Sequence, residues 1–170
     1  MTTSADPTAL VVVDTNVLLA ATDRSRAAHA TATAFLNNDE RRLALTPQIV
    51  REYLVVSTRP VEVNGFGLAG ADAVANVKQF LDDMVLLSED AVTTAGLVDL
   101  IGDYAVAGKQ VHDANVVAVA LAHGASAIVS DGVRHFARFD DLIAIENLLD
   151  PHSAGHGIDF DVLLSGEAWR

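Results

Sequence analysis

The sequence contains no cysteine and few aromatic residues, basic residues or long apolar runs. The absence of cysteine excludes disulfides and thiolate metal sites, and it fits a reducing compartment. No apolar run approaches the roughly 20 residues that a membrane-spanning helix needs. The stretch 1–8 is polar and acidic, and it lacks the basic and apolar regions of a signal peptide. These absences predict a cytoplasmic protein with no membrane partner.

Basic residues are outnumbered about two to one, with 11 Lys and Arg against 23 Asp and Glu, a formal net charge of −12. This charge argues against simple electrostatic binding of nucleic acid. The objection weakens if several acids gather in one site and bind divalent cations, because the ions reverse the local field. An acidic body also suits a basic protein partner.

Apolar residues make up 51% of the 170 residues, enough to bury one sizeable core, and the length predicts one domain. Short apolar runs alternate with segments of helical spacing. The predicted strands are 10–13, 43–45, 85–87, 127–130 and 142–145. The predicted helices are 17–21, 25–38, 47–56, 72–83, 89–107 and 113–123. The alternation predicts an α/β/α sandwich with a mainly parallel, roughly five-stranded sheet in a domain spanning 1–149, followed by a tail at 150–170.

Asp14 follows the first apolar run, 10–13, at the point where a strand buried on both faces leaves the sheet. In open α/β sheets, ligands bind beyond the carboxyl ends of the strands, so Asp14 stands where chemistry is expected. The alternative is that Asp14 or Asn16 only caps the next helix.

Three further acids map to the same edge of the sheet. Asp131 directly follows the strand 127–130, Glu52 lies in the second turn of the helix after the second strand, and Asp113 opens a helix. Each also has an ordinary structural interpretation: Asp113 as an N-cap, Glu52 as a solvated helix residue, and Asp131 as the start of a turn. Their shared position favours function.

Four carboxylates at one edge repel one another unless protons or a metal ion neutralise them. Oxygen ligands without cysteine favour hard cations, which predicts Mg²⁺ or Mn²⁺ as the cofactor. The chemistry that follows is metal-assisted hydrolysis of a phosphodiester.

Four segments, in this order, resemble the PIN domain, and more narrowly the VapC-type ribonuclease toxins of bacterial toxin–antitoxin pairs. They are Val-Asp-Thr-Asn at 13–16, Glu52, His-Asp-Ala at 112–114, and Ile-Val-Ser-Asp at 128–131 with Phe136 beyond. The resemblance covers about 10–148.

The resemblance implies a compact α/β/α endoribonuclease that uses Mg²⁺ or Mn²⁺, acts on RNA, forms a homodimer and is neutralised by a cognate antitoxin. By position, Asp14, Glu52 and Asp113 match the three central acids of the family. Thr15 or Asn16 is then expected to orient Asp14 by hydrogen bonding. Ser130 matches the hydroxyl residue that usually precedes the last acidic segment.

The last segment departs from the family pattern, because His135 stands before Phe136 where the family commonly has an Asp. We take Asp131 as the fourth acid and predict metal ligation by Asp14, Asp113 and Asp131, with Glu52 binding metal directly or positioning water. The basic cluster near this site is expected to contact the RNA backbone. It consists of Arg134, His135 and Arg138.

Two alternatives remain open. One is a catalytically inactive PIN-fold protein-binding module, which the irregular segment 131–135 favours. The other is a Mg²⁺-dependent phosphatase of the haloacid-dehalogenase type, which also places an Asp after its first strand. That family needs a second Asp two residues later, where this sequence has Asn16.

Overall fold

The computed structural model describes residues 6–150, so the predicted tail lies outside the described residues except for Asp150. Five strands form one parallel sheet in the order β3-β2-β1-β4-β5. Their bounds are β1 (Leu10–Val13), β2 (Arg42–Leu45), β3 (Val85–Leu86), β4 (Ala127–Ser130) and β5 (Ala144–Asn147). The predicted fold class, an α/β sandwich around a parallel sheet, is confirmed.

Strand β1 lies at the centre of the sheet between β2 and β4. Val12 pairs in register with Ala44 on one side and with Ile128 on the other. Val11, Val12 and Val13 are each 0% exposed, which explains why this strand is an unbroken apolar run. The strand order reverses between β1 and β4, so the carboxyl ends of these two strands form the crevice where open α/β sheets bind ligands.

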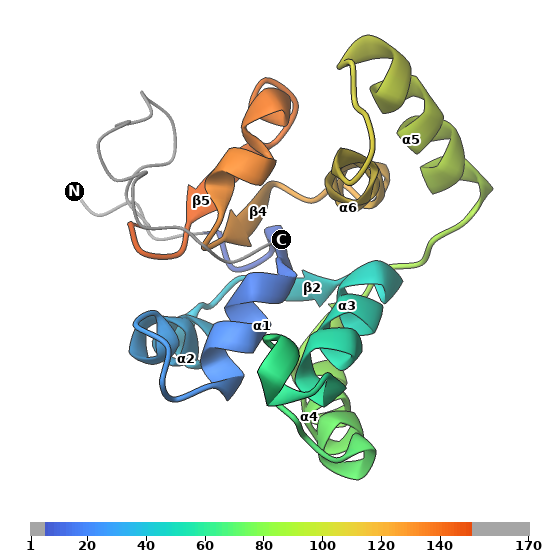
Figure 1. The fold of residues 1–170 in the computed structure, drawn as a ribbon. Helices are drawn as coiled ribbons and strands as arrows, with labels where there is room; N and C mark the ends of the chain where they lie inside the picture. The colour runs from blue at the N-terminus through green and yellow to red at the C-terminus, as the bar shows by residue number, and fades with distance from the viewer. Residues whose placement is uncertain (1–5, 151–170) are drawn as a thin grey trace.

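The helices cover both faces of the sheet (Figure 1). Their bounds are α1 (Thr15–Thr22), α2 (His29–Asn38), α3 (Pro47–Thr58), α4 (Gly70–Asp83), α5 (Ala91–Asp103) and α6 (Gln110–Ala122), with short 3₁₀ segments η1 (Val61–Val63), η2 (Val133–His135) and η3 (Ala137–Phe139). Helices α1 to α4 gather on one side, and α5, α6 and the segment η2–η3 lie on the other. This division follows from right-handed crossovers, because the chain first winds from β1 toward β3 and then returns to β4 and β5.

Three predicted helix boundaries are wrong for local reasons. Helix α2 begins at His29 and not at residue 25, because the Asp23 carboxylate accepts from the Ser25 N–H and hydroxyl and closes a turn. Helix α5 begins after Asp90, whose side chain forms a capping box with Thr93, and not at residue 89. It ends before Ala105, which has a positive φ of 50°, and not at residue 107.

Two further boundaries differ near the predicted site. Helix α6 begins at Gln110, three residues before the predicted start at Asp113. Strand β5 begins at Ala144 and not at residue 142, because the N–H groups of Leu142 and Ile143 both donate to the carbonyl of Phe139. Those two bonds close the turn after η3, so neither residue is extended. Among the described helices, none is both long and apolar enough to span a bilayer.

A single guanidinium joins the two halves of the sheet. Arg41, just before β2, donates to both carboxylate oxygens of Glu146 on β5, at 2.8 and 2.9 Å. It also binds Asp39, at 2.8 to 3.3 Å. The three side chains are only 13–15% exposed. Because β1 and β4 lie between β2 and β5, this cluster fastens the sheet across its central strands.

Candidate active site

Asp14 lies where β1 ends and α1 begins, and both of its carboxylate oxygens are held. The N–H of Thr15 donates to Oδ1 at 2.7 Å, and the Ser130 hydroxyl donates to Oδ2 at 2.7 Å. Asp14 has extended backbone angles and is the N-cap of α1, whereas Asn16 lies inside the helix. The capping interpretation is therefore right for Asp14 and wrong for Asn16. Capping turns the carboxylate toward the end of β4.

Ser130 connects the ends of the two central strands. Its buried hydroxyl donates to Asp14 and accepts from Asn16 Nδ2 at 3.1 Å and from the Gly132 N–H at 2.9 Å. A hydroxyl has one donor and two acceptor sites, so all three are used. Asn16 also accepts from the Asp131 N–H at 3.0 Å. Asn16 thus bonds Ser130 and the Asp131 N–H, and of the two residues expected to bond Asp14, Thr15 is the one that does.

Glu52 lies in the second turn of α3, as predicted, and its two oxygens are also held. The Thr15 hydroxyl donates to Oε2 at 2.8 Å, and Gln48 Nε2 donates to Oε1 at 2.8 Å. Thr15 bonds Asp14 as expected, through its backbone N–H, and its side chain in addition orients Glu52. Thr15 therefore contacts two acids at once, one through each group.

Asp113 lies in the first turn of α6 and does not open the helix as predicted, because α6 begins three residues earlier, at Gln110. The N-cap position is occupied by Lys109, whose side chain makes no capping bond. Its Oδ2 is 4.0 Å from His135 Nδ1. Carboxylates are favoured in the first turn of a helix by the positive end of the helix dipole.

The three acids influence one another electrostatically. Burial raises the pKa of Asp14 to about 6, with smaller contributions from the charges of Glu52 and Asp113, while the bonds from Ser130 and Thr15 oppose the rise. Burial also raises the pKa of Asp113 to about 6, again with a contribution from Glu52. Such mutual repulsion marks a cluster of carboxylates that a cation would stabilise.

Asp131 stands apart from this cluster. It is exposed, and its backbone N–H is bonded to Asn16. Burial raises the pKa of its carboxyl group, and the charge that opposes this rise is that of Arg26. The acids that raise the pKa of Asp14 are Glu52 and Asp113. The structure therefore brings three of the four predicted acids together and places Asp131 at their margin.

Two of the three residues that are predicted to contact RNA lie close to Asp113. His135 is 4.0 Å from its carboxylate, and Arg138, together with His112, lowers its pKa. Arg134 is exposed on η2. Despite the acidic body, positive charge thus lies next to the acids.

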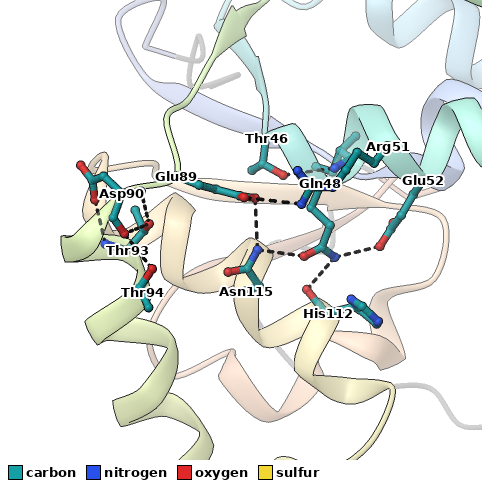
Figure 2. A network of polar contacts seen from close by, with 11 residues as sticks. Thr46, Gln48, Arg51, Glu52, Glu89, Asp90, Thr93, Thr94, His112 and Asn115 are labelled. Carbon is teal, nitrogen blue, oxygen red and sulfur yellow. Dashed lines mark hydrogen bonds and ion pairs between the residues drawn. The ribbon is translucent and has the colours of Figure 1, made fainter.

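Sequence reasoning missed Gln48 and Asn115. Figure 2 shows that the Gln48 amide contacts Glu52 on one side, Asn115 on the other and the backbone carbonyl of His112 below. A signal for Gln48 was available, because it precedes Glu52 by four residues on one helix and the two side chains share a face. No comparable signal marks Asn115, whose partner is 67 positions away.

The donor set fits a hydrated divalent cation. Among the described residues, no three His, Asp or Glu side chains are close enough together to hold a metal ion as they stand. Mg²⁺ keeps several waters and takes only one or two carboxylates directly, so it does not require such a cage. The oxygen donors of Asp14, Glu52 and Asp113, two of them with raised pKa, suit this mode of binding.

The fold is similar to several solved structures. A chain of DNA-bound VapBC from Salmonella typhimurium aligns with a TM-score of 0.62 and 18% identity over 82% of this chain and 98% of that one. VapBC2 from Rickettsia felis, bound to a promoter DNA fragment, aligns with a TM-score of 0.60 and 17% identity, over 81% and 98%. VapC20 from Mycobacterium tuberculosis, described as a sarcin-ricin loop cleaving toxin, aligns with a TM-score of 0.56 and 16% identity, over 69% and 86%.

A comparison with curated protein sequences finds no significant match. A family model does match, however. The PIN domain model aligns with residues 11–142, which run from β1 to the end of the η3 turn and include Asp14, Glu52, Asp113 and Asp131. This range is well over half of the chain, and the chain therefore belongs to the PIN domain family.

Proposed function

We propose that the protein is the toxin of a toxin–antitoxin pair, a Mg²⁺- or Mn²⁺-dependent endoribonuclease that hydrolyses RNA phosphodiester bonds. The observation that carries the proposal is the cluster of Asp14, Glu52 and Asp113 at one sheet edge, with the pKa of two of them raised to about 6. The similarity to a structure described as a sarcin-ricin loop cleaving toxin, and to one described as a toxin–antitoxin complex, supports it.

In this proposal the cation is held by Asp14 and Asp113, with Glu52 binding it directly or positioning a water, and with Asp131 as a peripheral ligand. A bound Mg²⁺ supplies an activated water and stabilises charge on the phosphate. Ser130 and Thr15 keep the carboxylates of Asp14 and Glu52 oriented. Arg138 supplies positive charge for the RNA backbone, His135 offers it a ring N–H, and Arg134 extends that surface.

The proposed partners follow from charge and similarity. A net charge of −12 suits a basic antitoxin segment. Another similar structure is described as a toxin–antitoxin complex from Klebsiella pneumoniae, which favours a cognate antitoxin here. We further propose a cytoplasmic homodimer, as the resemblance implies.

The decisive experiment is cleavage of RNA by purified Asp14→Asn protein. We expect cleavage to require Mg²⁺ or Mn²⁺ and to be lost in this variant, with an unchanged circular dichroism spectrum. Asp99→Asn, an exposed position on α5, removes the same charge and should cleave like the wild type. Undiminished cleavage by Asp14→Asn would refute the proposal.

A second candidate is an inactive PIN-fold binding module. Two observations favour it: Asp131 stands apart from the other acids, and no three acidic or histidine side chains of residues 6–150 form a ready metal cage. Isothermal titration calorimetry with Mn²⁺ separates the nuclease from the inactive module. A nuclease should bind the ion and lose that binding in Asp14→Asn, whereas an inactive module need not bind it at all. Membership of the PIN family removes the haloacid-dehalogenase alternative.

A further inference from the structure

We infer that Gln48 and Asn115 form a directional hydrogen-bond relay that fixes the Glu52 carboxylate in the proposed site. The relay (Glu89, Asn115 and Gln48) begins in the loop before α5, passes through α6 and ends on α3. It deepens the proposed function, because it names positioning residues for the same site.

The contacts are continuous (Figure 2). Asn115 Nδ2 donates to Glu89 Oε1 at 3.2 Å and to Gln48 Oε1 at 2.8 Å. Gln48 Nε2 in turn donates to Glu52 Oε1 at 2.8 Å and to the His112 carbonyl at 2.9 Å. Both amide nitrogens therefore use both of their hydrogens.

The direction of the relay is set by its outer end. Glu89 is a carboxylate and only accepts hydrogen bonds, so the NH₂ group of Asn115 must face it. That same NH₂ group also reaches Gln48, so the oxygen of Gln48 must face Asn115. The nitrogen of Gln48 is then left facing Glu52. A flipped Gln48 amide would place its oxygen against the Glu52 carboxylate, which repels it.

Gln48 also connects two of the acids. Its second hydrogen bond ends on the carbonyl of His112, the residue directly before Asp113. One buried side chain, 6% exposed, therefore holds the carboxylate of Glu52 and the backbone beside Asp113. Because α3 and α6 meet here, the relay sets the distance between an acid on each helix.

A purely structural role is the alternative, in which Gln48 only fills space between α3 and α6. The two roles differ in one respect. A packing residue tolerates a side chain of equal length without polar groups, whereas a relay depends on donor direction. An isosteric change at Asn115, which touches neither Glu52 nor metal, therefore tests the relay.

The first experiment compares Gln48→Met and Asn115→Asp. Gln48→Met keeps length and loses every relay bond, while Asn115→Asp removes the donor that orients Gln48. Loss of groups that orient metal ligands typically costs about 10–100-fold, so we expect each variant to lower kcat and Mn²⁺ affinity by such a factor at unchanged KM for RNA. The double variant should be no worse than Gln48→Met alone, because both changes act through one side chain.

The matched control is Asn76→Asp on α4, which makes the same substitution at a half-buried amide that donates to the Tyr53 hydroxyl at 2.9 Å. It should keep wild-type kcat and Mn²⁺ affinity. The relay is overturned if Asn115→Asp behaves like this control, if the losses of the two variants multiply, or if activity falls only in proportion to Tm.

The second experiment does not depend on cleavage. This experiment compares ¹⁵N–¹H spectra of the variants with that of the wild type. We expect the side-chain NH₂ resonances of Gln48 to shift in both Asn115→Asp and Glu52→Gln, and to keep their wild-type positions in Asn76→Asp. Unmoved Gln48 resonances in Asn115→Asp overturn the relay. If the wild type cleaves no RNA with any divalent ion, the nuclease proposal fails while these spectra still decide the relay.

Discussion

Asp113 illustrates what it costs to bury a charged side chain beside another acid. Its pKa is raised from 3.8 to about 6 by burial and by the charge of Glu52, and its described ion-pair partner, His135 Nδ1, is 4.0 Å away. A carboxyl whose pKa is higher in the folded state favours folding while it is protonated. That contribution is complete below about pH 3.8 and is lost as the pH rises through about 6.

We therefore predict that Asp113→Asn stabilises the metal-free protein at pH 7.5, by up to about 3 kcal/mol, since each pKa unit is worth about 1.4 kcal/mol. The gain should vanish at pH 4, where the wild-type carboxyl group is protonated as well. Urea denaturation at the two pH values measures this. Equal gains at both would show that the charge is not the cause.

A matched variant sharpens this measurement. Asp99 is exposed on α5, so Asp99→Asn removes one charge from the surface and none from the interior. It should leave the free energy of unfolding within about 0.5 kcal/mol of the wild type. Added Mn²⁺ should stabilise the wild type and not Asp113→Asn, which reverses the order of the two proteins.

At the residue scale, the candidate acids and the supports Thr15 and Ser130 could be named from the sequence, whereas the amides that support Glu52 could not. Each acid lies at a strand end or early in a helix, where a carboxylate also has an ordinary structural role, so only their shared position at one sheet edge favoured a function. Gln48 and Asn115 are uncharged amides inside helices. From the sequence alone, such a residue cannot be told apart from an amide that only faces solvent. Their function depends on contacts across 67 residues of sequence.

At the scale of elements, the loop between β4 and η2 is the tightest part of the site. A Cβ atom added to Gly132 would lie 2.9 Å from His135 Cδ2 and 3.1 Å from Asn16 Nδ2. Asn16 is the residue that bonds Ser130 and the Asp131 N–H. The absence of a side chain at Gly132 therefore lets the imidazole and the amide close over the end of β4.

We predict that Gly132→Ala displaces both side chains and lowers RNA cleavage about tenfold to a hundredfold, because small displacements of positioned groups have such effects. Kinetics with a fixed RNA substrate, together with Tm, measures it. Gly102→Ala on α5, where an added Cβ meets nothing within 4 Å, is the control and should cleave normally. Wild-type cleavage by Gly132→Ala would contradict the role of this loop.

Elements with strong apolar patterns were predictable, and their ends were less so. The four residues of β1 match the prediction because burial on both faces leaves an unbroken apolar run. Strand β5 was placed two residues early, since Leu142 and Ile143 look like a strand but close a turn on Phe139. The start of α6 was missed because Lys109 precedes it without a capping side chain.

For the whole molecule, the Arg41 cluster is a polar link between β2 and β5 across the central strands. Arg41→Ala would leave Asp39 and Glu146 without their shared cation at 13–15% exposure. We predict a loss of about 2–4 kcal/mol in the free energy of unfolding, because breaking a buried ion pair strands a charge. The midpoint of urea denaturation measures this loss.

Arg51→Ala provides the comparison. Arg51 pairs with Glu89 at 3.5 Å, and its side chain is 63% exposed, so its removal should cost less than about 1 kcal/mol. Equal losses for the two variants would show that burial does not set the strength of the Arg41 cluster.

The position of β4 beside β1 has a consequence for a chain that is still being synthesised. Asp14 and Ser130 touch across 116 residues, and Asp113 enters the chain only shortly before β4. A ribosome that has translated the first hundred residues therefore holds a fragment with two of the three clustered acids and no β4 to orient Asp14. Asp14 and Asp113 therefore come together only after α6 and β4 have been made. While the growing chain lacks β4, the Asp14 carboxylate has no Ser130 hydroxyl to orient it, and the proposed site is not assembled.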